Sequence, residues 1–198
     1  MDGVGIVKTL LLARHGEAER TGVLLGQTNP PLSERGLEQA RTLASGWTDL
    51  EVERLIASNL QRSQDTAKVV GYNLLLEIEV DRRLNELSYG LWDGKPWADI
   101  EDAYPETAKR KLQDWWGVTP EGGEAAHDFY ARVEAAWRSL IAAPESTIAV
   151  VGHTAVNAVI ADLARRKNRR GGDAPDWDRI QRFEQEPGAF LRLEFSNS

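Results

Sequence analysis

The sequence predicts an α/β fold, a three-layer α/β/α sandwich whose central sheet is mostly parallel. Short apolar runs typical of buried strands, at residues 8–13, 54–57 and 147–151, alternate with longer segments whose apolar residues recur at helical spacing. This alternation favours a parallel sheet with helices on both faces. The chain has 198 residues and no repeat, low-complexity tract or long linker, so we expect one domain over residues 1–198.

Helical periodicity and turn residues place the remaining elements. Ser33 is positioned to cap a first helix that continues to Trp47. Further helices are expected at about 62–72, 107–116, 124–142 and 154–166. The aromatic and turn-rich stretch at about 81–120 is expected to form an excursion over the site rather than core. Residues 179–195 predict a strand, a turn and a second strand.

Composition excludes several classes of function. The formal net charge of -7 argues against a general nucleic-acid binder, which usually has a basic face. We interpret the basic cluster at 165–170 as a solvated helix end rather than a partner-binding patch. The absence of cysteine excludes thiolate nucleophiles and cysteine-based metal sites. No segment is long and apolar enough to span a bilayer, and the start lacks a basic region typical of signal peptides, so we expect a cytoplasmic protein.

Two of the predicted strands end in a histidine. The first runs into Arg14-His15-Gly16 and the last into Gly152-His153. Because ligands in such sheets bind beyond the carboxyl ends of the strands, neighbouring positions would bring both imidazoles to one pocket. Arg62, at the start of the next helix, could reach the same pocket. Two arginines, a histidine and the helix N-terminus after His153 suit a phosphoryl group, and Gly16 would allow close backbone approach to a ligand.

An imidazole is the best candidate nucleophile in this sequence, because cysteine and a Gly-x-Ser-x-Gly elbow are both absent. The flanking arginines should lower the pKa of His15 and keep it neutral. The leaving alkoxide needs a proton, and Glu86 and Asp93 are both candidate donors. Zinc on His15 and His153 is a rival interpretation, but no His-x-His, His-Glu-x-x-His or carboxylate cluster completes a metal shell. We interpret His127 as a surface residue.

Six motifs in order resemble those of the histidine phosphatase superfamily, also called phosphoglycerate mutase-like. The motifs are Arg14-His15-Gly16-Glu17, Gly26 with the run 32–40, Ser58 through Ala67, Leu84 through Gly94, Pro120 through Glu124, and Val151-Gly152-His153. The resemblance covers nearly the whole chain and implies the phosphoglycerate mutase-like fold.

The resemblance also implies roles for individual residues. His15 would be phosphorylated, and Glu86 rather than Asp93 would act as general acid and then as base for water. Arg14, Arg62 and His153 would hold the phosphoryl group, with help from the backbone amide of Thr154. Three positions depart from the common pattern, namely Thr21, Asp65 and Thr154, which stand where asparagine, glutamine and glycine are frequent. Thr21 keeps a hydroxyl donor and remains a candidate substrate contact. No metal or organic cofactor is implied.

Hydrolysis of a small phosphorylated metabolite is the favoured function, with a cofactor-dependent phosphoglycerate mutase as the alternative. Glu86 is followed by Leu87-Ser88-Tyr89-Gly90, which lacks the basic residues that mutases of the family usually carry there. A binding protein that keeps the fold without the chemistry is a third hypothesis, disfavoured because all five expected catalytic residues are present. The expected partner is a small-molecule phosphate ester, and the sequence is compatible with a homodimer.

The tryptophans leave the identity of the ester open. Those at 92, 97, 115 and 116 could form an apolar wall for a bulky or nucleoside-like leaving group. Tryptophans at such spacing more often pack in a core. Both interpretations stand at this point.

Overall fold

The computed structural model describes residues 7–167 and 174–196, and it contains the predicted sheet. Five strands lie in the order β3-β2-β4-β1-β5. The strands are β1 (Val7–Arg14), β2 (Arg54–Ala57), β3 (Ile78–Val80), β4 (Thr147–Gly152) and β5 (Phe190–Ser196). The first four run parallel, and β5 pairs with β1 in the antiparallel direction. The expectation of a mostly parallel sheet is confirmed.

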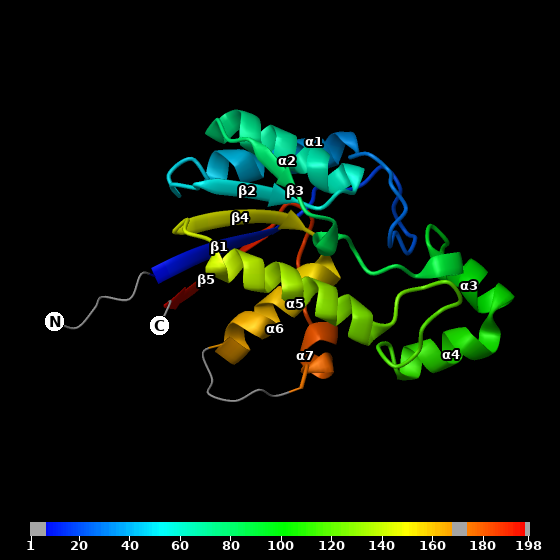
Figure 1. Ribbon diagram of the computed structural model, residues 1–198. Helices are drawn as coiled ribbons and strands as arrows, with labels where there is room; N and C mark the ends of the chain where they lie inside the picture. The colour runs from blue at the N-terminus through cyan, green and yellow to red at the C-terminus, as the bar shows by residue number, and fades with distance from the viewer. Residues whose placement is uncertain (1–6, 168–173, 197–198) are drawn as a thin grey trace.

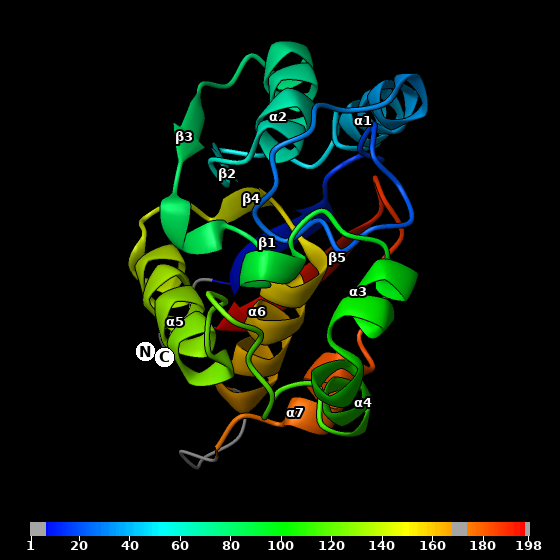
Figure 2. The same cartoon turned by 90° about the vertical axis from the view of Figure 1, so that its right-hand side faces the viewer.

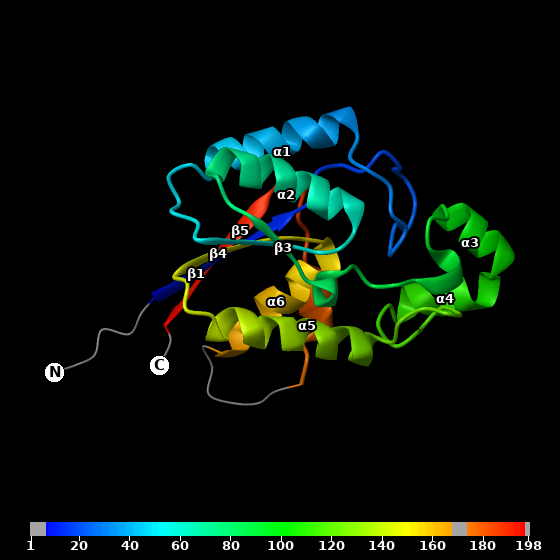
Figure 3. The ribbon, with the colours of Figure 1, turned by 45° about the horizontal axis from the view of Figure 1, so that its top comes forward.

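Side chains of β1 alternate between the two faces of the sheet, because successive residues of a strand point in opposite directions. Leu10 and Leu12 pack on one face in a core shared with α5 (Ala126–Ala142) and α6 (Thr154–Lys167). Leu11 and Ala13 pack on the other face, against α1 (Glu34–Gly46) and α2 (Gln61–Leu74). Figures 1 and 3 show the resulting three layers, with α1 and α2 on one side and α5 and α6 on the other. Ser33 caps α1 as predicted, since its hydroxyl accepts from Gly36 N.

The stretch that follows β3 lies beyond the carboxyl ends of the parallel strands, as Figures 1 and 2 show. It contains two short 3₁₀ helices, η1 (Arg82–Leu84) and η2 (Gly90–Trp92), and two α-helices, α3 (Trp97–Ala103) and α4 (Pro105–Gln113). Trp92, Ile100 and Ala108 form a small apolar core of their own here, with Trp97 and Tyr104 packed against it. The stretch thus has a small core of its own, and for Trp92 and Trp97 this agrees with the interpretation of the tryptophans as packing residues.

The C-terminal region corrects another prediction. Only its second half is a strand, β5, while the segment before it forms a short helix, α7 (Trp177–Gln181). The carboxylate of Asp176 accepts from Arg179 N and caps α7, and Ile180 is buried in the larger core. A cap followed by one buried apolar residue per turn suits a helix better than a strand. The short strand β3 was missed, because its side chains are mostly exposed.

The structure also tests the predictions for surface residues. His127 is exposed on α5, as predicted. Arg165 to Lys167 end α6, where cations favour the helix dipole, and residues 168–170 of the basic cluster lie outside the described residues. No helix in the described ranges is both long and apolar enough to cross a bilayer.

Candidate active site

The site begins where β1 and β4 end side by side. The two strands are hydrogen-bonded neighbours, with Arg14 opposite Gly152. The backbone N–H of His15 donates to Gly152 O at 3.1 Å, which extends the pairing by one residue. The rings of His15 and His153 consequently lie 5.0 Å apart between centroids. The predicted convergence of the two imidazoles is confirmed.

His15 has a defined tautomer. Its Nδ1 lies 2.7 Å from Gly16 O, and a carbonyl oxygen can only accept, so Nδ1 carries the hydrogen. The lone pair is then on Nε2, which accepts a hydrogen bond from Arg62 Nε at 3.1 Å. Burial, with smaller contributions from Arg62 and Arg14, lowers the pKa of His15 to about 3, and the Gly16 carbonyl opposes this shift. The ring is neutral at pH 7, and burial contributes more to this than the arginines that the sequence pointed to.

Arg62 is almost completely buried at the start of α2 and is held by backbone carbonyls. Nη1 donates to Thr28 O at 2.6 Å and Nη2 to Gly26 O at 2.8 Å, so the loop between β1 and α1 fixes the guanidinium. Burial lowers its pKa to about 10, and Glu86 and Asp93 oppose that effect. Arg62 therefore stays cationic at pH 7. Three of its five N–H groups are used in these contacts.

Arg14 is turned toward the segment that precedes β5. Its Nη1 donates to Gln185 O at 2.6 Å, while its buried Nε has no partner among the described residues. Burial lowers its pKa, opposed by Glu86 and Glu186. The side chain of Gln185 is itself fixed, because it donates to Leu12 O at 2.8 Å and accepts from Asn157 at 2.8 Å. Gln185 and Asn157 thus position Arg14, and neither was predicted.

His153 is fully buried and has one satisfied ring nitrogen. Its Nε2 lies 2.7 Å from the hydroxyl of Ser58, which follows β2. Its Nδ1 has no partner in the described part of the chain. Burial, followed by the nearby His15 and Arg62, lowers its pKa well below the usual value. Thr154, the next residue, begins α6, so the N-terminal amides of this helix open toward the same region.

Glu86 reaches the N-terminus of α6. Oε2 accepts from Ala155 N at 3.3 Å and Oε1 from Leu87 N at 2.9 Å. Burial raises the pKa of Glu86, and the two backbone N–H groups, Arg62 and Arg132 oppose that rise. The result is a carboxyl group held toward its protonated form at the N-terminus of α6, the helix that follows His153.

The backbone around Glu86 is held by Arg132 of α5. Nη1 of Arg132 donates to Arg83 O at 2.8 Å and to Asn85 O at 2.7 Å, and Nη2 donates to Glu86 O at 3.1 Å. The carboxylate of Glu124 accepts from Arg132 at 2.6 and 2.8 Å and orients it. We refer to Arg132 and Glu124 as the clamp. The sequence offered a signal for it, since Glu124 closes one of the six motifs and Arg132 follows eight residues later.

Asp93, the other candidate acid, bonds mainly within its own loop. Its carboxylate accepts from Tyr89 N at 3.0 Å and from the Ser88 hydroxyl at 3.3 Å. Burial raises its pKa as well. A Cβ at Gly26 would lie 1.7 Å from Asp93 Oδ1, so the carboxylate packs tightly against the loop that holds Arg62. The contact of Glu86 with α6, next to His153, favours Glu86 as the group that reaches a substrate.

Gly16 and Thr21 complete the predicted set. Gly16 N donates to the Thr66 hydroxyl at 3.0 Å, and a Cβ at Gly16 would lie 2.3 Å from Gly36 O. The observed reason for glycine here is thus close approach of the α1 backbone. Thr21 is exposed and has no hydrogen bond to the other predicted site residues among those described. Substrate contacts of Gly16 and Thr21 stay predictions.

Two tryptophans of the excursion line a cavity that opens beside Glu86. The cavity measures about 310 Å³, and Trp115, Trp116, Glu86 and Thr154 are among its lining residues. The interpretation of an apolar wall therefore applies to this pair, whereas Trp92 and Trp97 pack in the small core. Residues 7–167 and 174–196 contain no group of three or more His, Cys, Asp or Glu side chains that could hold a metal ion.

The family follows from a match over nearly the whole chain. The model of the histidine phosphatase superfamily (branch 1) matches residues 10–197. The chain belongs to this superfamily. In this histidine phosphatase-family protein, Arg14, His15 and His153 of the predicted motifs lie at or directly after the carboxyl ends of β1 and β4, and their roles stay predictions.

Curated relatives and solved structures agree with the family. Bifunctional protein Rv2228c of Mycobacterium tuberculosis is 34% identical over 165 residues, which are 81% of this chain but only 45% of that protein. Phosphoserine phosphatase 1 of Hydrogenobacter thermophilus is 31% identical, over 73% of this chain and 70% of that protein. The crystal structure of the alpha-ribazole phosphatase from Shigella flexneri superimposes with a TM-score of 0.82 at 25% identity, covering 96% of this chain and 94% of that one.

Proposed function

We propose that this protein is a metal-independent phosphomonoesterase that works through a phosphohistidine at His15. One observation carries the proposal: the imidazole of His15 is neutral, with its lone pair on Nε2 next to the cationic Arg62. An uncharged imidazole beside a fixed guanidinium suits attack on a phosphoryl group, whose negative charge the cation stabilises.

In the first step, His15 Nε2 attacks phosphorus and the bond from phosphorus to the ester oxygen breaks. The protonated carboxyl of Glu86 gives its proton to that oxygen, so the leaving group departs as a neutral alcohol. Arg14, Arg62 and His153 hold the phosphoryl oxygens. Arg14 Nε and His153 Nδ1, which have no partner among the described residues, supply two buried nitrogens for that purpose. The amide of Thr154 is a further donor at the α6 N-terminus.

In the second step, the carboxylate of Glu86 takes a proton from water as the water attacks phosphorus. The bond from phosphorus to Nε2 breaks. Inorganic phosphate is released and His15 returns to its neutral form. Glu86 is protonated again and the cycle closes without a net change in the enzyme.

Transfer to water is favoured over transfer to a second phosphoglycerate. A mutase must grip a carboxylate and a second phosphate, yet no basic residue stands among the described residues that line the cavity beside Glu86. The relatives named phosphoserine phosphatase and alpha-ribazole phosphatase also support hydrolysis. We further propose a cytoplasmic location and a small-molecule ester as the partner, with a homodimer as a compatible assembly.

The test compares release of inorganic phosphate from a panel of phosphomonoesters with conversion of 3- to 2-phosphoglycerate. We expect phosphate release that persists in EDTA and is lost in His15→Asn. Dominant phosphoglycerate interconversion, or activity that EDTA removes and a metal ion restores, would contradict the proposal.

A further inference from the structure

The cavity beside Glu86 is lined mainly by apolar and aromatic side chains. Its volume is about 310 Å³, close to the lower limit of small-molecule sites. Glu86 and Thr154 connect it to the predicted phosphoryl site. The rest of the lining described includes Tyr89, Trp115, Trp116, Ile180 and Phe183.

The aromatic walls are supported from behind by other rings. Trp116 stacks on Phe129 with centroids 6.1 Å apart and packs on Trp177 at 4.9 Å. Trp115 contacts Tyr89 at 6.0 Å and Trp97 at 6.2 Å. Side chains held in this way lose little further freedom when a ligand binds, so the pocket is largely preformed.

The charge of the pocket is as informative as its shape. Glu86 is its one acidic residue among the lining residues described, and lysine, arginine and histidine are absent from that set. A carboxylate or second phosphate on the leaving group would enter this pocket without a cationic partner, at a substantial desolvation cost.

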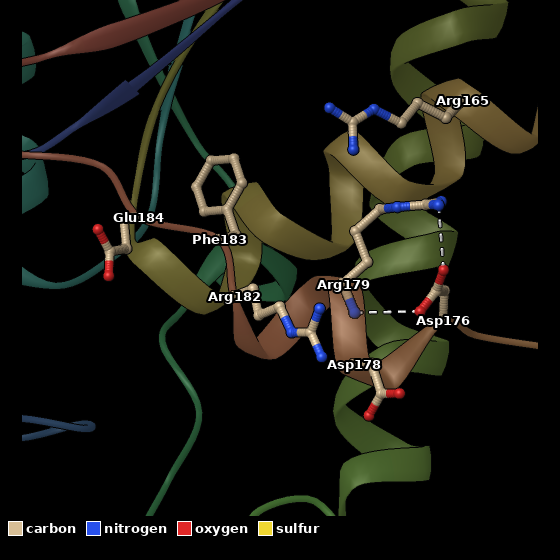
Figure 4. Close-up of a pocket in the computed structure, with 7 residues that line it drawn as sticks. All are labelled: Arg165, Asp176, Asp178, Arg179, Arg182, Phe183 and Glu184. Carbon is tan, nitrogen blue, oxygen red and sulfur yellow. Dashed lines mark hydrogen bonds and ion pairs between the residues drawn. The ribbon is translucent and has the colours of Figure 1, made fainter.

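A charged hollow lies on the far side of Phe183 and does not change this conclusion. Figure 4 shows its arginines, Arg165, Arg179 and Arg182, together with Asp176, Asp178 and Glu184. Arg179 is already paired with Asp176 at 3.2 Å. The three acidic residues match the three arginines in number, so the described lining of the hollow has no excess positive charge that would attract an anion.

We propose that this pocket holds the leaving group, and that the substrate is the phosphate ester of an alcohol that carries an uncharged aromatic ring. The inference rests on the proposed function, in which Glu86 protonates the ester oxygen and the leaving group must therefore start beside Glu86. The flat walls of Trp115, Trp116 and Phe183 then contact the ring, as aromatic side chains do in offset or edge-on pairs.

The first experiment uses esters of primary alcohols, so that the reactivity of the leaving oxygen stays similar. We expect kcat/KM for 2-phenylethyl phosphate to exceed that for ethyl phosphate by about 10- to 100-fold, the range for burying a phenyl-sized group. We expect 3-phosphoglycerate, which adds a carboxylate, to be the poorest of the three. Equal values for the first two esters, or a preference for 3-phosphoglycerate, would overturn the inference.

Variants locate the preference in the pocket. Trp115→Ala and Phe183→Ala should each reduce the ratio of kcat/KM between the two alkyl esters by about tenfold, and Trp115→Phe should keep most of it. Tyr72→Ala is the matched control, because Tyr72 is an 88% exposed aromatic residue on α2. An unchanged ratio in both alanine variants would assign the preference to another surface and contradict the proposal.

Binding of phosphonates separates this inference from the proposed function. The dissociation constants of 3-phenylpropylphosphonate and propylphosphonate are measured by calorimetry, which needs no turnover. At least tenfold tighter binding of the phenyl compound supports the pocket even if no ester is hydrolysed, in which case the proposed function alone fails. Equal binding, together with phosphate release that depends on His15, overturns the pocket and leaves the proposed function standing.

Discussion

At the scale of single residues, the two carboxyl groups that act on Arg62 differ in their hydrogen-bond partners and not in the direction of their pKa shifts. Burial raises the pKa of both Glu86 and Asp93. Only Glu86 accepts from the N-terminus of α6, next to His153. Proximity to the phosphoryl site, more than the pKa, therefore assigns the proton transfer to Glu86.

Glu86→Gln should lower kcat/KM for ethyl phosphate by about 10²- to 10⁴-fold, because the alkoxide then leaves without a proton. For p-nitrophenyl phosphate the loss in the first step should be much smaller, because nitrophenolate is a stable leaving group. Dephosphorylation would still lack its base, so rapid mixing should show a burst of nitrophenol followed by slow turnover. Equal losses for both esters, without a burst, would argue that Glu86 only supports the structure.

The sequence predicted the titratable residues of the site but not the backbone groups that hold their side chains in position. Arg14 ends β1, and His15 and His153 directly follow β1 and β4, so the predicted strands locate all three in the sequence. Backbone carbonyls such as Gly26 O and Thr28 O, which fix Arg62, carry no signature in the sequence. The dominant effect of burial on the pKa of His15 was also missed, because desolvation depends on packing from several elements.

At the scale of elements, the clamp joins α5 to the loop that carries Glu86. Arg132 donates to three carbonyl groups of that loop region, those of residues 83, 85 and 86. Glu124 holds the guanidinium in place from the other side. The clamp acts on the reaction only through the position of Glu86.

Arg132→Ala should reduce kcat by about 10- to 100-fold with a smaller change in KM, since a displaced acid affects the proton transfer most. The pH profile provides the specific readout: the decline of kcat toward high pH should move, because Arg132 also lowers the pKa of Glu86. Arg138→Ala is the control, because Arg138 is on the same helix and is exposed in its pair with Glu134. If the profile of Arg132→Ala keeps its shape and only the melting temperature falls, the clamp has no role in positioning.

Elements with strong local signals were predicted and those without were not. The Ser33 cap and the apolar stripe of α5 were read correctly, because side-chain bonds and periodicity are local. The helix α7 has only five residues, too few to show a period, and was taken for a strand. The exposed edge strand β3 lacks the apolar run that marked β1 and β4.

At the scale of the whole molecule, the buried histidines connect stability to pH. Burial lowers the pKa of His15 from 6.5 to about 3. Between these values the unfolded chain binds a proton that the folded chain does not, so stability is lost as the pH falls through this window. The raised pKa of Glu86 acts in the opposite sense, because folding then favours the protonated form and stability falls as the pH rises above the usual carboxyl range.

The contribution of His15 to the free energy of unfolding should fall by about 2 kcal/mol between pH 7.5 and pH 5. Urea unfolding of the native protein and of His15→Asn at both pH values measures it as the difference between the two pH dependences. His153→Asn should behave in the same direction, since burial lowers that pKa too. The exposed His127→Asn is the control. A pH dependence that is identical in all four proteins would contradict the neutral, buried state of the site histidines.

The central claim is that the phosphoryl group is transferred first to His15 and then to water. Trapping the phosphohistidine intermediate tests this claim most directly. Rapid quenching of the enzyme with a ³²P-labelled phosphomonoester, followed by peptide mapping, should locate the label on His15. That label should be lost in acid and be retained in alkali, and it should accumulate in Glu86→Gln when the ester is labelled p-nitrophenyl phosphate. Hydrolysis that proceeds with no label on His15, or that survives in His15→Asn, would contradict the account.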